Sequence, residues 1–505
     1  MTGRALMVQG TASHVGKSVL VAGLCRLYAQ AGVRVAPFKA QNMSLNSYVT
    51  PAGGEIGRAQ AVQADAAMVE PHIDMNPILL KPTRDHVSQV VIHGRPVREM
   101  AAGAYWREGM DEAWTAIEAS FARLASAYDL VLIEGAGSPA EVNLRERDLA
   151  NMRVAKYAQA PVLLVGDIER GGIFASLLGT LMLLPDDERR LVQGLVVNKF
   201  RGDASLFRDG VRFLAERSGI PVAGVIPYLE LDIPNEDSLS LSEQREQGAT
   251  EVKVAVIRHP HISNFTDFDA LRRTDGVAVQ FTLAPEVVAT ADVVILPGTK
   301  NTVEDLAALR SRGLDAAIRK AREQGKAVVG LCGGMQMLGD RLEDPQGLEG
   351  GRPGSYAGLG LLPITTRFVA GKTTHQARGR LVAGGEGWQG VAISGYEVHS
   401  GESELLPGAA AFGEIEARSG LSVRAEDGAF VDRLLFGTYF HGIFDAAPFR
   451  RAFLDEVRAR KGLPPLSDAQ LSAGERSAQG LDALAEHLRR HLDLRLLERL
   501  TGIAP

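Results

Sequence analysis

A cysteine surrounded by glycines is the clearest chemical signal in this sequence. Cys332 ends the apolar run 327–331 and stands in "GLCGG", with Gly330 before it and Gly333 and Gly334 directly after it. This G-x-nucleophile-x-G pattern is typical of a sharp strand-to-helix turn, where the start of the helix favours a thiolate. A buried structural cysteine is the alternative, but it needs no glycines at these positions. The pattern predicts a nucleophilic Cys332, with the backbone N–H of Gly333 as an oxyanion donor.

A cysteine nucleophile needs a base, which is most often a histidine. His441 closes the apolar stretch "FGTYF" and is followed by Gly442, so we expect it at a strand end with an open approach. His399, in "GYEVHSG", is the rival candidate. The stretch "VVILPGTKNT" ends another predicted strand, and its backbone N–H groups around Gly298 are expected to complete an oxyanion hole. The second half of the chain therefore predicts a cysteine–histidine pair.

A second chemical signal lies near the N-terminus, where "VQGTASHVGKS" joins an apolar strand to an apolar helix. Gly16, Lys17 and Ser18 match the end of the phosphate-loop pattern G-x-x-x-x-G-K-[ST], but Thr11 occupies the place of the first glycine and Gly10 precedes it. Backbone N–H groups at a helix start bind an anion, a lysine reaches the phosphates, and a serine hydroxyl holds Mg²⁺. The alternative is a G-K-S sequence in an ordinary turn. The flanking strand and helix favour ATP binding.

Polar side chains also follow the buried strands predicted after this loop. Glu134 ends "VLIE" and Asp167 ends "VLLVGD", and we expect both to be Mg²⁺ ligands at the carboxyl edge of a sheet, although each is alternatively a solvated acid. Lys39, in "APFKAQN", is expected to add positive charge near the transferred phosphoryl group, unless it is a surface lysine. Asn198, in "VVNKF", is a candidate for recognition of the nucleotide base.

These residues need a scaffold of alternating strands and helices. Helical segments such as 17–31 separate apolar runs, an alternation that is typical of a doubly wound α/β domain with a parallel sheet. The runs are apolar nearly throughout, as expected for strands buried on both faces. These strands are predicted at residues 5–10, 33–38, 129–135, 160–167 and 194–200.

The pattern changes around residues 229–251, which are polar, acidic and poor in core residues. A second α/β series follows, with a helix predicted across 303–324 and later strands that look mixed or antiparallel. No chemistry is assigned to the amphipathic C-terminal helix. The predicted organisation is an ATP-binding domain at 1–235, a linker at 236–251, a second doubly wound α/β domain at 252–447 and a helical tail at 448–505.

The composition limits the classes of function. The 505 residues are 45% hydrophobic and 23% charged, as in ordinary soluble proteins of several domains. A net charge of −6 argues against a nucleic-acid partner, and no apolar run approaches the roughly 18 residues of a membrane span. Two cysteines, Cys25 and Cys332, make no disulfide framework, so we expect a cytoplasmic setting. Whether copies of the chain form a homo-oligomer is left open.

Longer stretches of the sequence resemble known proteins. Cys332 in "GLCGGMQMLG" with His441 in "YFHGIF" resembles a class I glutamine amidotransferase domain, and "GTASHVGKS" with "LIEGAGS" resembles ATPases of the dethiobiotin-synthetase type. Together with "PFKAQNMSLNS", "DIERGGIFASLLGT", "LPGTKNT" and "GYEVHSG", the chain resembles the cobyric acid synthase family along nearly its whole length. Class I triads usually carry a Glu two residues after the histidine, but this position is Ile443. The resemblance therefore implies a Cys–His dyad whose imidazole is oriented by another group, which the sequence does not identify.

The resemblance also implies a reaction. ATP, Mg²⁺ and glutamine would be used to amidate carboxylates b, d, e and g of the corrinoid adenosylcobyrinic acid a,c-diamide, giving adenosylcobyric acid. The stretches "QNMSLNSY" and "GRAQAVQADAA" would help to hold the acid, although the second is equally an ordinary helix. Alternatives are cobyrinic acid a,c-diamide synthase, an amidotransferase for another acid, and a binding module with an inactive glutaminase. A partitioning ATPase is disfavoured, because "GTASHVG" lacks the extra lysine of that class.

Overall fold

The computed structural model describes residues 4–84, 87–229, 250–467 and 473–505. The chain divides into two compact units, which we call unit 1 and unit 2. The predicted linker at 236–251 lies, apart from its last two residues, outside the described residues. Unit 1 comprises Met1–Ser44, Glu55–Glu236 and Arg476–Pro505, and unit 2 comprises Leu45–Gly54 and Asp237–Glu475.

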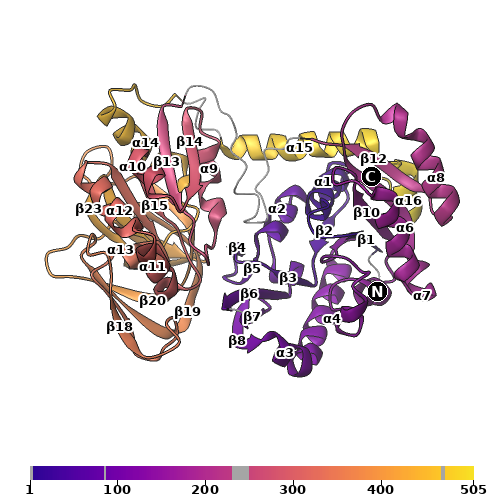
Figure 1. The fold of residues 1–505 in the computed structure, drawn as a ribbon, viewed down its shortest axis with the longest axis horizontal. Helices are drawn as coiled ribbons and strands as arrows, with labels where there is room; N and C mark the ends of the chain where they lie inside the picture. The colour runs from indigo at the N-terminus through magenta and orange to yellow at the C-terminus, as the bar shows by residue number, and fades with distance from the viewer. Residues whose placement is uncertain (1–3, 85–86, 230–249, 468–472) are drawn as a thin grey trace. The chain divides into compact units, whose positions relative to one another are not determined.

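Unit 1 is built on a six-stranded parallel sheet with the strand order β12-β11-β10-β1-β9-β2. Figure 1 labels β12, β10, β1 and β2 of this sheet. The five strands that the apolar runs predict are all present, and β12 is added at one edge. The strands are β1 (Arg4–Gly10), β2 (Val35–Phe38), β9 (Leu130–Glu134), β10 (Val162–Asp167), β11 (Val192–Phe200) and β12 (Val222–Pro227).

Both faces of this sheet are covered, which explains why its strands are apolar throughout. Leu6 and Val8 belong to a core with α1, α15 and α16, whereas Met7, between them, belongs to a core with α4, α5 and α6. The C-terminal helices thus complete one layer of unit 1. The helices are α1 (Lys17–Gln30), α2 (Arg58–Ala66), α3 (Ala102–Ala104), α4 (Met110–Ala127), α5 (Met152–Ala158), α6 (Ile173–Leu183), α7 (Asp186–Arg189), α8 (Arg208–Ser218), α15 (Ala473–His491) and α16 (Leu494–Thr501).

A second, four-stranded sheet in unit 1 was not predicted from the sequence. Its order is β3-β6-β7-β8, with β3 parallel to β6 and the other pairs antiparallel. Its strands β3 and β6 follow the segments that carry Lys39 and Asn76. The strands are β3 (Gln41–Met43), β6 (Ile78–Arg84), β7 (Val87–Ile92) and β8 (Arg95–Ala101).

Unit 2 contains a second doubly wound sheet, with the order β14-β13-β15-β16-β24-β23, in which only the edge strand β23 is antiparallel to its neighbour. The fold class predicted from the sequence, two α/β domains with parallel sheets, is confirmed. The strands are β13 (Val252–Ile257), β14 (Val277–Thr282), β15 (Val293–Leu296), β16 (Ala327–Leu331), β23 (Ala429–Asp432) and β24 (Leu435–Thr438).

A mixed sheet in the order β18-β17-β19-β21-β22, with β20 also paired to β19, completes unit 2, as the mixed character of the later strands predicted. Its long hairpin β19–β20 carries the "GYEVHSG" stretch. The strands are β17 (Arg341–Asp344), β18 (Gly354–Ala357), β19 (Ile364–Leu381), β20 (Ala392–Leu405), β21 (Gly413–Arg418) and β22 (Leu421–Asp427).

The single helix predicted across 303–324 is wrong, because the structure contains two helices there. Gly313 has a φ of +68°, a left-handed conformation that ends a helix and that glycine adopts without steric cost. No described helix of either unit combines the length and the apolar character that crossing a bilayer requires. The helices of unit 2 are α9 (Asp269–Arg272), α10 (Pro285–Thr290), α11 (Thr302–Ser311), α12 (Leu314–Glu323), α13 (Gly333–Leu338) and α14 (Ala447–Arg460).

Candidate active sites

The predicted phosphate loop connects β1 to α1 in unit 1. Lys17 is the first residue of α1, and its ammonium group donates hydrogen bonds to the carbonyl oxygens of Ala12, at 2.9 Å, and of Gly137, at 3.0 Å. The backbone N–H of Thr11 donates to the carbonyl of Val165 on the neighbouring strand β10, at 2.9 Å. The loop therefore folds back over the lysine, with the first N–H groups of α1 at its end, an arrangement suited to binding an anion.

Two glycines make this loop conformation possible. A Cβ at Gly10 would lie 2.5 Å from Cγ2 of Val15 and 2.9 Å from Nζ of Lys17, so the close approach falls one residue earlier than in the usual pattern. Gly16 has a φ of +97°, and a Cβ there would lie 2.3 Å from Nδ2 of Asn198. The same Nδ2 donates to the carbonyl of Val15, at 2.8 Å. Asn198 thus contacts the phosphate loop directly.

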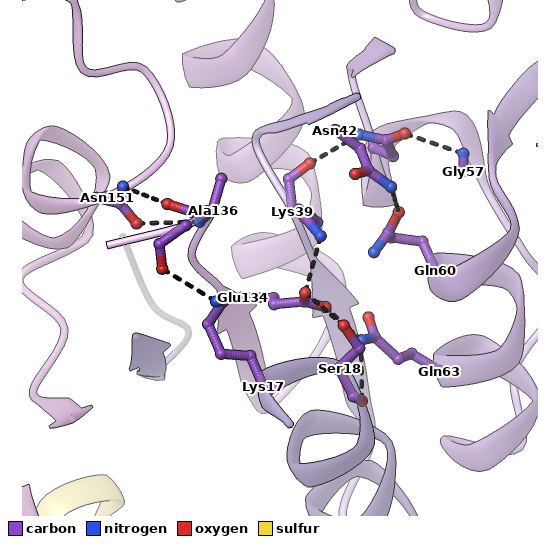
Figure 2. A network of polar contacts seen from close by, with 12 residues as sticks. Lys17, Ser18, Lys39, Asn42, Gly57, Gln60, Gln63, Glu134, Ala136 and Asn151 are labelled. Atoms are coloured by element: carbon purple, nitrogen blue, oxygen red, sulfur yellow. Dashed lines mark hydrogen bonds and ion pairs between the residues drawn. The ribbon is translucent and has the colours of Figure 1, made fainter. Parts of the chain in front are cut away.

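Glu134, at the end of β9, is the centre of a buried polar network (Figure 2). One oxygen, Oε1, accepts from the hydroxyl of Ser18 at 2.7 Å and from the ammonium of Lys39 at 2.8 Å. The other oxygen accepts from the side-chain amide of Gln63, at 2.6 Å. Lys39 and Glu134 are both buried, so the cation balances a carboxylate that lies out of water. Ser18, Lys39 and Glu134, which the sequence suggested separately, are therefore brought together.

Asp167 lies at the end of β10 and is connected to a different part of the loop. Its Oδ1 accepts the backbone N–H of Glu169 at 2.9 Å, and its Oδ2 is 3.0 Å from the ammonium of Lys199. Lys199 also donates to the carbonyl of His14 in the phosphate loop, at 2.7 Å. The structure therefore places Asp167 beside the loop through an ion pair, whereas Glu134 contacts Ser18 directly.

The helix α2 contributes polar groups whose function was left open by the sequence. Besides the contact of Gln63 with Glu134, the side chain of Gln60 accepts a hydrogen bond from Asn42 at 3.1 Å (Figure 2). Within the described part of the chain, Nε2 of Gln60 and Oε1 of Gln63 are buried and make no hydrogen bond. Buried amide groups of this kind are costly unless a ligand satisfies them. The stretch "GRAQAVQADAA" was expected either to help to hold the acid or to form an ordinary packing helix. Both functions are compatible with α2.

In unit 2, Cys332 lies at the predicted turn between β16 and α13. Its φ and ψ angles are 49° and −113°, values that a residue other than glycine rarely adopts. A Cβ at Gly334 would lie 1.9 Å from the carbonyl oxygen of Leu296, and one at Gly330 would lie 2.5 Å from Cα of Met335. The glycines before and after the cysteine are thus explained by the close approach of neighbouring backbone.

The loop after β15 lies against both predicted catalytic residues. A Cβ at Gly298 would lie 2.7 Å from Cε1 of His441, and a Cβ at Gly333 would lie 3.2 Å from the backbone N of Thr299. Gly298 therefore contacts the histidine, and the N–H that lies near the cysteine turn belongs to Thr299. Sequence reasoning selected this loop, but it did not identify Thr299.

His441 is held by an aspartate that sequence reasoning missed. Nδ1 of His441 is 2.7 Å from Oδ2 of Asp267, and the other oxygen of Asp267 accepts the backbone N–H of Gly442 at 2.9 Å. Burial alone lowers the pKa of His441, but the charge and hydrogen bond of Asp267, together with a hydrogen bond and the charge of Cys332, raise it to about 10. The imidazole is therefore protonated at neutral pH, between an acid and the thiol.

The rival His399 has different partners. Its Nδ1 lies 2.8 Å from the carbonyl of Gly401, and its ring stacks on Tyr439 with 3.7 Å between the centroids. The neighbouring Glu397 receives two hydrogen bonds from Arg418, at 2.7 and 2.9 Å. Nε2 of His399 lies 3.7 Å from Oε1 of Glu397, which is too long for a hydrogen bond, whereas His441 is 2.7 Å from Asp267.

Comparisons with known proteins agree with this arrangement. Residues 6–239 match the model of the CobQ/CobB/MinD/ParA nucleotide binding domain, and residues 253–449 match that of the CobB/CobQ-like glutamine amidotransferase domain. The chain is 49% identical to the cobyric acid synthase of Desulforudis audaxviator over 506 residues, which cover 100% of both chains. It is 48% identical to that of Nostoc sp. over 98% of this chain and 99% of the relative, and 47% identical to that of Sorangium cellulosum over 100% and 99%.

Identity at this level over the full length, with both matched domains in the same order, shows the family. The nucleotide-binding match includes the phosphate loop and Glu134, and the amidotransferase match includes Cys332, His441 and Asp267. The chain is therefore a glutamine-hydrolysing amidotransferase that belongs to the cobyric acid synthase family.

Proposed function

We propose that this chain amidates carboxylates b, d, e and g of adenosylcobyrinic acid a,c-diamide, with glutamine as the nitrogen donor and ATP as the source of energy. The observation that supports the proposal most strongly is that one chain, whose relatives are named cobyric acid synthases, holds two separate groups of residues suited to these two reactions. One centre contains Lys17, Ser18 and Glu134, and the other contains Cys332 and His441.

The thiol centre releases ammonia from glutamine. The sulfur of Cys332 attacks the side-chain amide carbon, and the developing oxyanion is stabilised by backbone N–H groups. His441, which is protonated at neutral pH because of Asp267, then donates its proton to the departing ammonia. Water, with its proton taken by the now neutral His441, hydrolyses the thioester to glutamate and restores the thiol. We assign the oxyanion donors to the backbone at Gly333 and at Gly298 or its neighbour Thr299.

The nucleotide centre makes the acid receptive to ammonia. A carboxylate is a poor acceptor, because its charge repels a nucleophile and because it has no good leaving group. Transfer of the terminal phosphoryl group of ATP to the carboxylate gives an acyl phosphate, and attack by ammonia then forms the amide and releases phosphate. In this step Lys17 and Lys39 supply positive charge. The nucleotide-binding residues proposed are Gly10, Thr11, Gly16, Lys17, Ser18, Lys39 and Asn198.

The residues around Glu134 fit Mg²⁺ bound together with a nucleotide. Mg²⁺ prefers oxygen ligands and is usually held by one or two carboxylates, with phosphates and water completing its shell. The hydroxyl of Ser18 and the carboxylate of Glu134 lie within 2.7 Å of each other, and Oε1 of Gln63 is a further buried oxygen beside them. When bound, Mg²⁺ neutralises charge on the phosphoryl group. We propose Ser18 and Glu134 as its residues, and Asp167, which is paired with Lys199, as a third candidate.

The product of the purified chain tests this proposal. With adenosylcobyrinic acid a,c-diamide, ATP, Mg²⁺ and glutamine, we expect mass spectrometry to show four carboxylates converted to amides, with one glutamate released for each. Cobyrinic acid, the substrate of the related a,c-diamide synthase, is the control and is expected to remain unchanged. Amidation of cobyrinic acid at positions a and c instead would overturn the substrate assignment while leaving the reaction class intact.

A further inference from the structure

Ten residues from the first half of the sequence are part of unit 2. The chain leaves unit 1 after Ser44, contributes Leu45–Gly54 to unit 2, and returns to unit 1 at Glu55. We call Leu45–Gly54 the bridging segment. It includes the strand β4 (Ser47–Val49), and Asn46, Ser47, Val49 and Thr50 are buried. Four of the five residues 46–50 are buried, which is unusual for a surface loop and agrees with the assignment of the segment to unit 2.

The bridging segment is hydrogen-bonded to the turn that carries Asp267. The backbone N–H of Ser47 donates to Oδ1 of Asn264 at 3.0 Å, and the hydroxyl of Thr266 donates to Oδ1 of Asn46 at 3.3 Å. Asn264 begins the short 3₁₀ helix Phe265–Phe268, which contains Asp267. The segment therefore holds this turn at Asn264 and at Thr266, which immediately precedes Asp267, the residue that orients His441.

Asn264 itself connects the segment to the catalytic histidine. It adopts a φ of +52°, a conformation that asparagine tolerates better than most residues. While its side-chain oxygen accepts from Ser47, its Nδ2 lies 3.3 Å from Nε2 and 3.4 Å from Nδ1 of His441. One amide group thus contacts the bridging segment with one end and the imidazole with the other.

A second connection passes through Tyr396 on β20. Its hydroxyl donates to the carbonyl of Ser47 at 3.2 Å, and its ring lies 6.0 Å from the ring of Tyr48. The same ring stacks on His441, with 5.3 Å between centroids and 20° between planes, and the two backbones exchange hydrogen bonds at 2.8 and 3.0 Å. Val49 packs with Tyr396 in a small apolar cluster. A displacement of the segment would therefore move Tyr396 and, with it, the surface against which His441 packs.

Both ends of the bridging segment are covalently attached to the network around Glu134. On its N-terminal side are Lys39, which is paired with Glu134, and Asn42 (Figure 2). On its C-terminal side is α2, in which Gln60 bonds to Asn42 and Gln63 bonds to Glu134. Nucleotide and acid bound at this network would act on the residues from which the segment starts and to which it returns.

We propose that the bridging segment couples the two reactions, so that an occupied nucleotide and acid site adjusts Asn264, Tyr396 and thereby His441 for glutamine hydrolysis. In this account Asn264 and Tyr396 are positioning residues, and the segment sets their positions. The inference rests on the proposed function, because it needs an acid acceptor in unit 1. Its chemical advantage is that glutamine is hydrolysed when an activated acid is ready to take the ammonia.

The test weakens the contacts of the segment with the turn and with β20, while it keeps the catalytic residues and the hydrogen bond from Ser47 to Asn264. The double variant Tyr396→Phe/Thr266→Val removes the hydroxyls that bond to Ser47 and Asn46 but retains the ring that stacks on His441. The control Tyr356→Phe removes a tyrosine hydroxyl of unit 2 that bonds to the carbonyl of Arg352. The readout is the glutaminase rate with ATP and the acid, divided by the rate without them, together with glutamate formed per amide.

In the wild-type chain and in Tyr356→Phe we expect ATP and acid to stimulate glutamine hydrolysis on the order of 10-fold, a typical size for coupling between two sites. In the double variant the ratio should fall towards one, and more glutamate should form per amide, while amidation from ammonium salts continues. A wild-type ratio in the double variant, or no stimulation in the wild-type chain, would overturn the inference. If the wild-type chain did not amidate the acid from ammonium salts, this result would instead contradict the proposed function.

A second measurement needs no variant. The rate at which iodoacetamide alkylates Cys332, which is 7% exposed, reports on the thiol and its histidine. Cys25, which is 0% exposed, should stay unmodified and thus shows that the fold is kept. We expect ATP with the acid to change the alkylation rate at Cys332, and this change to disappear in the double variant. An identical rate with and without ATP and acid would contradict the proposed coupling.

Discussion

Lys17 and Ser18 are neighbours in the sequence, whereas Asp267 and His441 are separated by 174 residues. The centre in unit 1 combines the phosphate loop with Glu134, which lies 116 residues from Ser18 in the sequence and whose charge is balanced by the cation of Lys39. The centre in unit 2 depends on segments that only the folded sheet brings together, and its acid is already bonded to the imidazole. We infer that the first centre is completed by its ligands and that the second is built before glutamine arrives.

This difference predicts which variants affect one reaction and which affect both. Lys17→Ala should have the largest effect, because this lysine is held in the phosphate loop by the carbonyls of Ala12 and of Gly137, which follows β9, and supplies positive charge to the phosphates. We expect amidation to be lost with glutamine and with ammonium salts alike, as measured by product mass spectrometry. Glutamine hydrolysis without ATP should persist, and its loss would show that the two centres are not separable.

Cys332→Ala should have an equally large effect on one nitrogen source only. Without the thiolate no thioester forms, so glutamine-dependent amidation should fall by at least on the order of 10³-fold. Amidation from concentrated ammonium salts should continue at the wild-type rate, since the nucleotide centre is untouched. Cys25→Ala is the matched control for the loss of a thiol, because Cys25 lies buried in α1, and it should retain glutamine use. If Cys332→Ala also lost the ammonium-dependent reaction, the separation of the two centres would be wrong.

Asp267→Asn should have an intermediate effect. The amide keeps the size of the side chain but loses the charge that raises the pKa of His441, so glutaminase kcat should fall on the order of 10²-fold. Activity that needs a protonated His441 is lost as the pH rises through its pKa, which is about 10 in the native chain. The alkaline limb of the pH–rate profile should therefore move to lower pH in the variant.

The matched control for this variant is Glu397→Gln, which removes a buried carboxylate of unit 2 that bonds to Arg418. Its alkaline limb should stay where the wild-type limb lies. An unchanged pH profile in Asp267→Asn would mean that the aspartate does not set the proton on His441, and the preformed character of this centre would then be in doubt.

Ser18→Ala should have the smallest effect of the four. The variant removes one hydroxyl beside Glu134, while Lys39 still balances the carboxylate, so the fold should be kept. We expect the Mg²⁺ concentration needed for half-maximal amidation to rise on the order of 10-fold, with either nitrogen source. An unchanged Mg²⁺ requirement would move the metal away from Ser18 and Glu134.

The parts of the molecule that local patterns encode were predictable. The phosphate loop, the strand ends at Glu134 and Asp167, and the turn at Cys332 each follow from a short run of residues with a known geometric need. The five central strands of unit 1 were likewise predicted, because strands buried on both faces are apolar throughout. Even the displaced Gly10 has a physical reason, since a Cβ there would meet Val15.

What could not be predicted depends on contacts between distant segments. Asp267 lies in "SNFTDFD", where nothing local distinguishes it from Asp269, and only the fold brings it to His441. The sequence around Gln63 is that of an ordinary helix, and only the structure shows that its side chain contacts Glu134. The bridging segment has no signal of its own that assigns it to unit 2. Gly313, by contrast, was a local signal whose helix-ending conformation was overlooked.

The central claim is that nitrogen released at Cys332 is the nitrogen that enters the acid activated at the nucleotide centre. The most direct test supplies the wild-type chain with ATP, Mg²⁺, the corrinoid acid and glutamine whose side-chain amide carries heavy nitrogen, in the presence of unlabelled ammonium at low concentration. Our account predicts heavy nitrogen in all the new amides of the product. Amides that contain only unlabelled nitrogen, formed while labelled ammonia accumulates in solution, would contradict it.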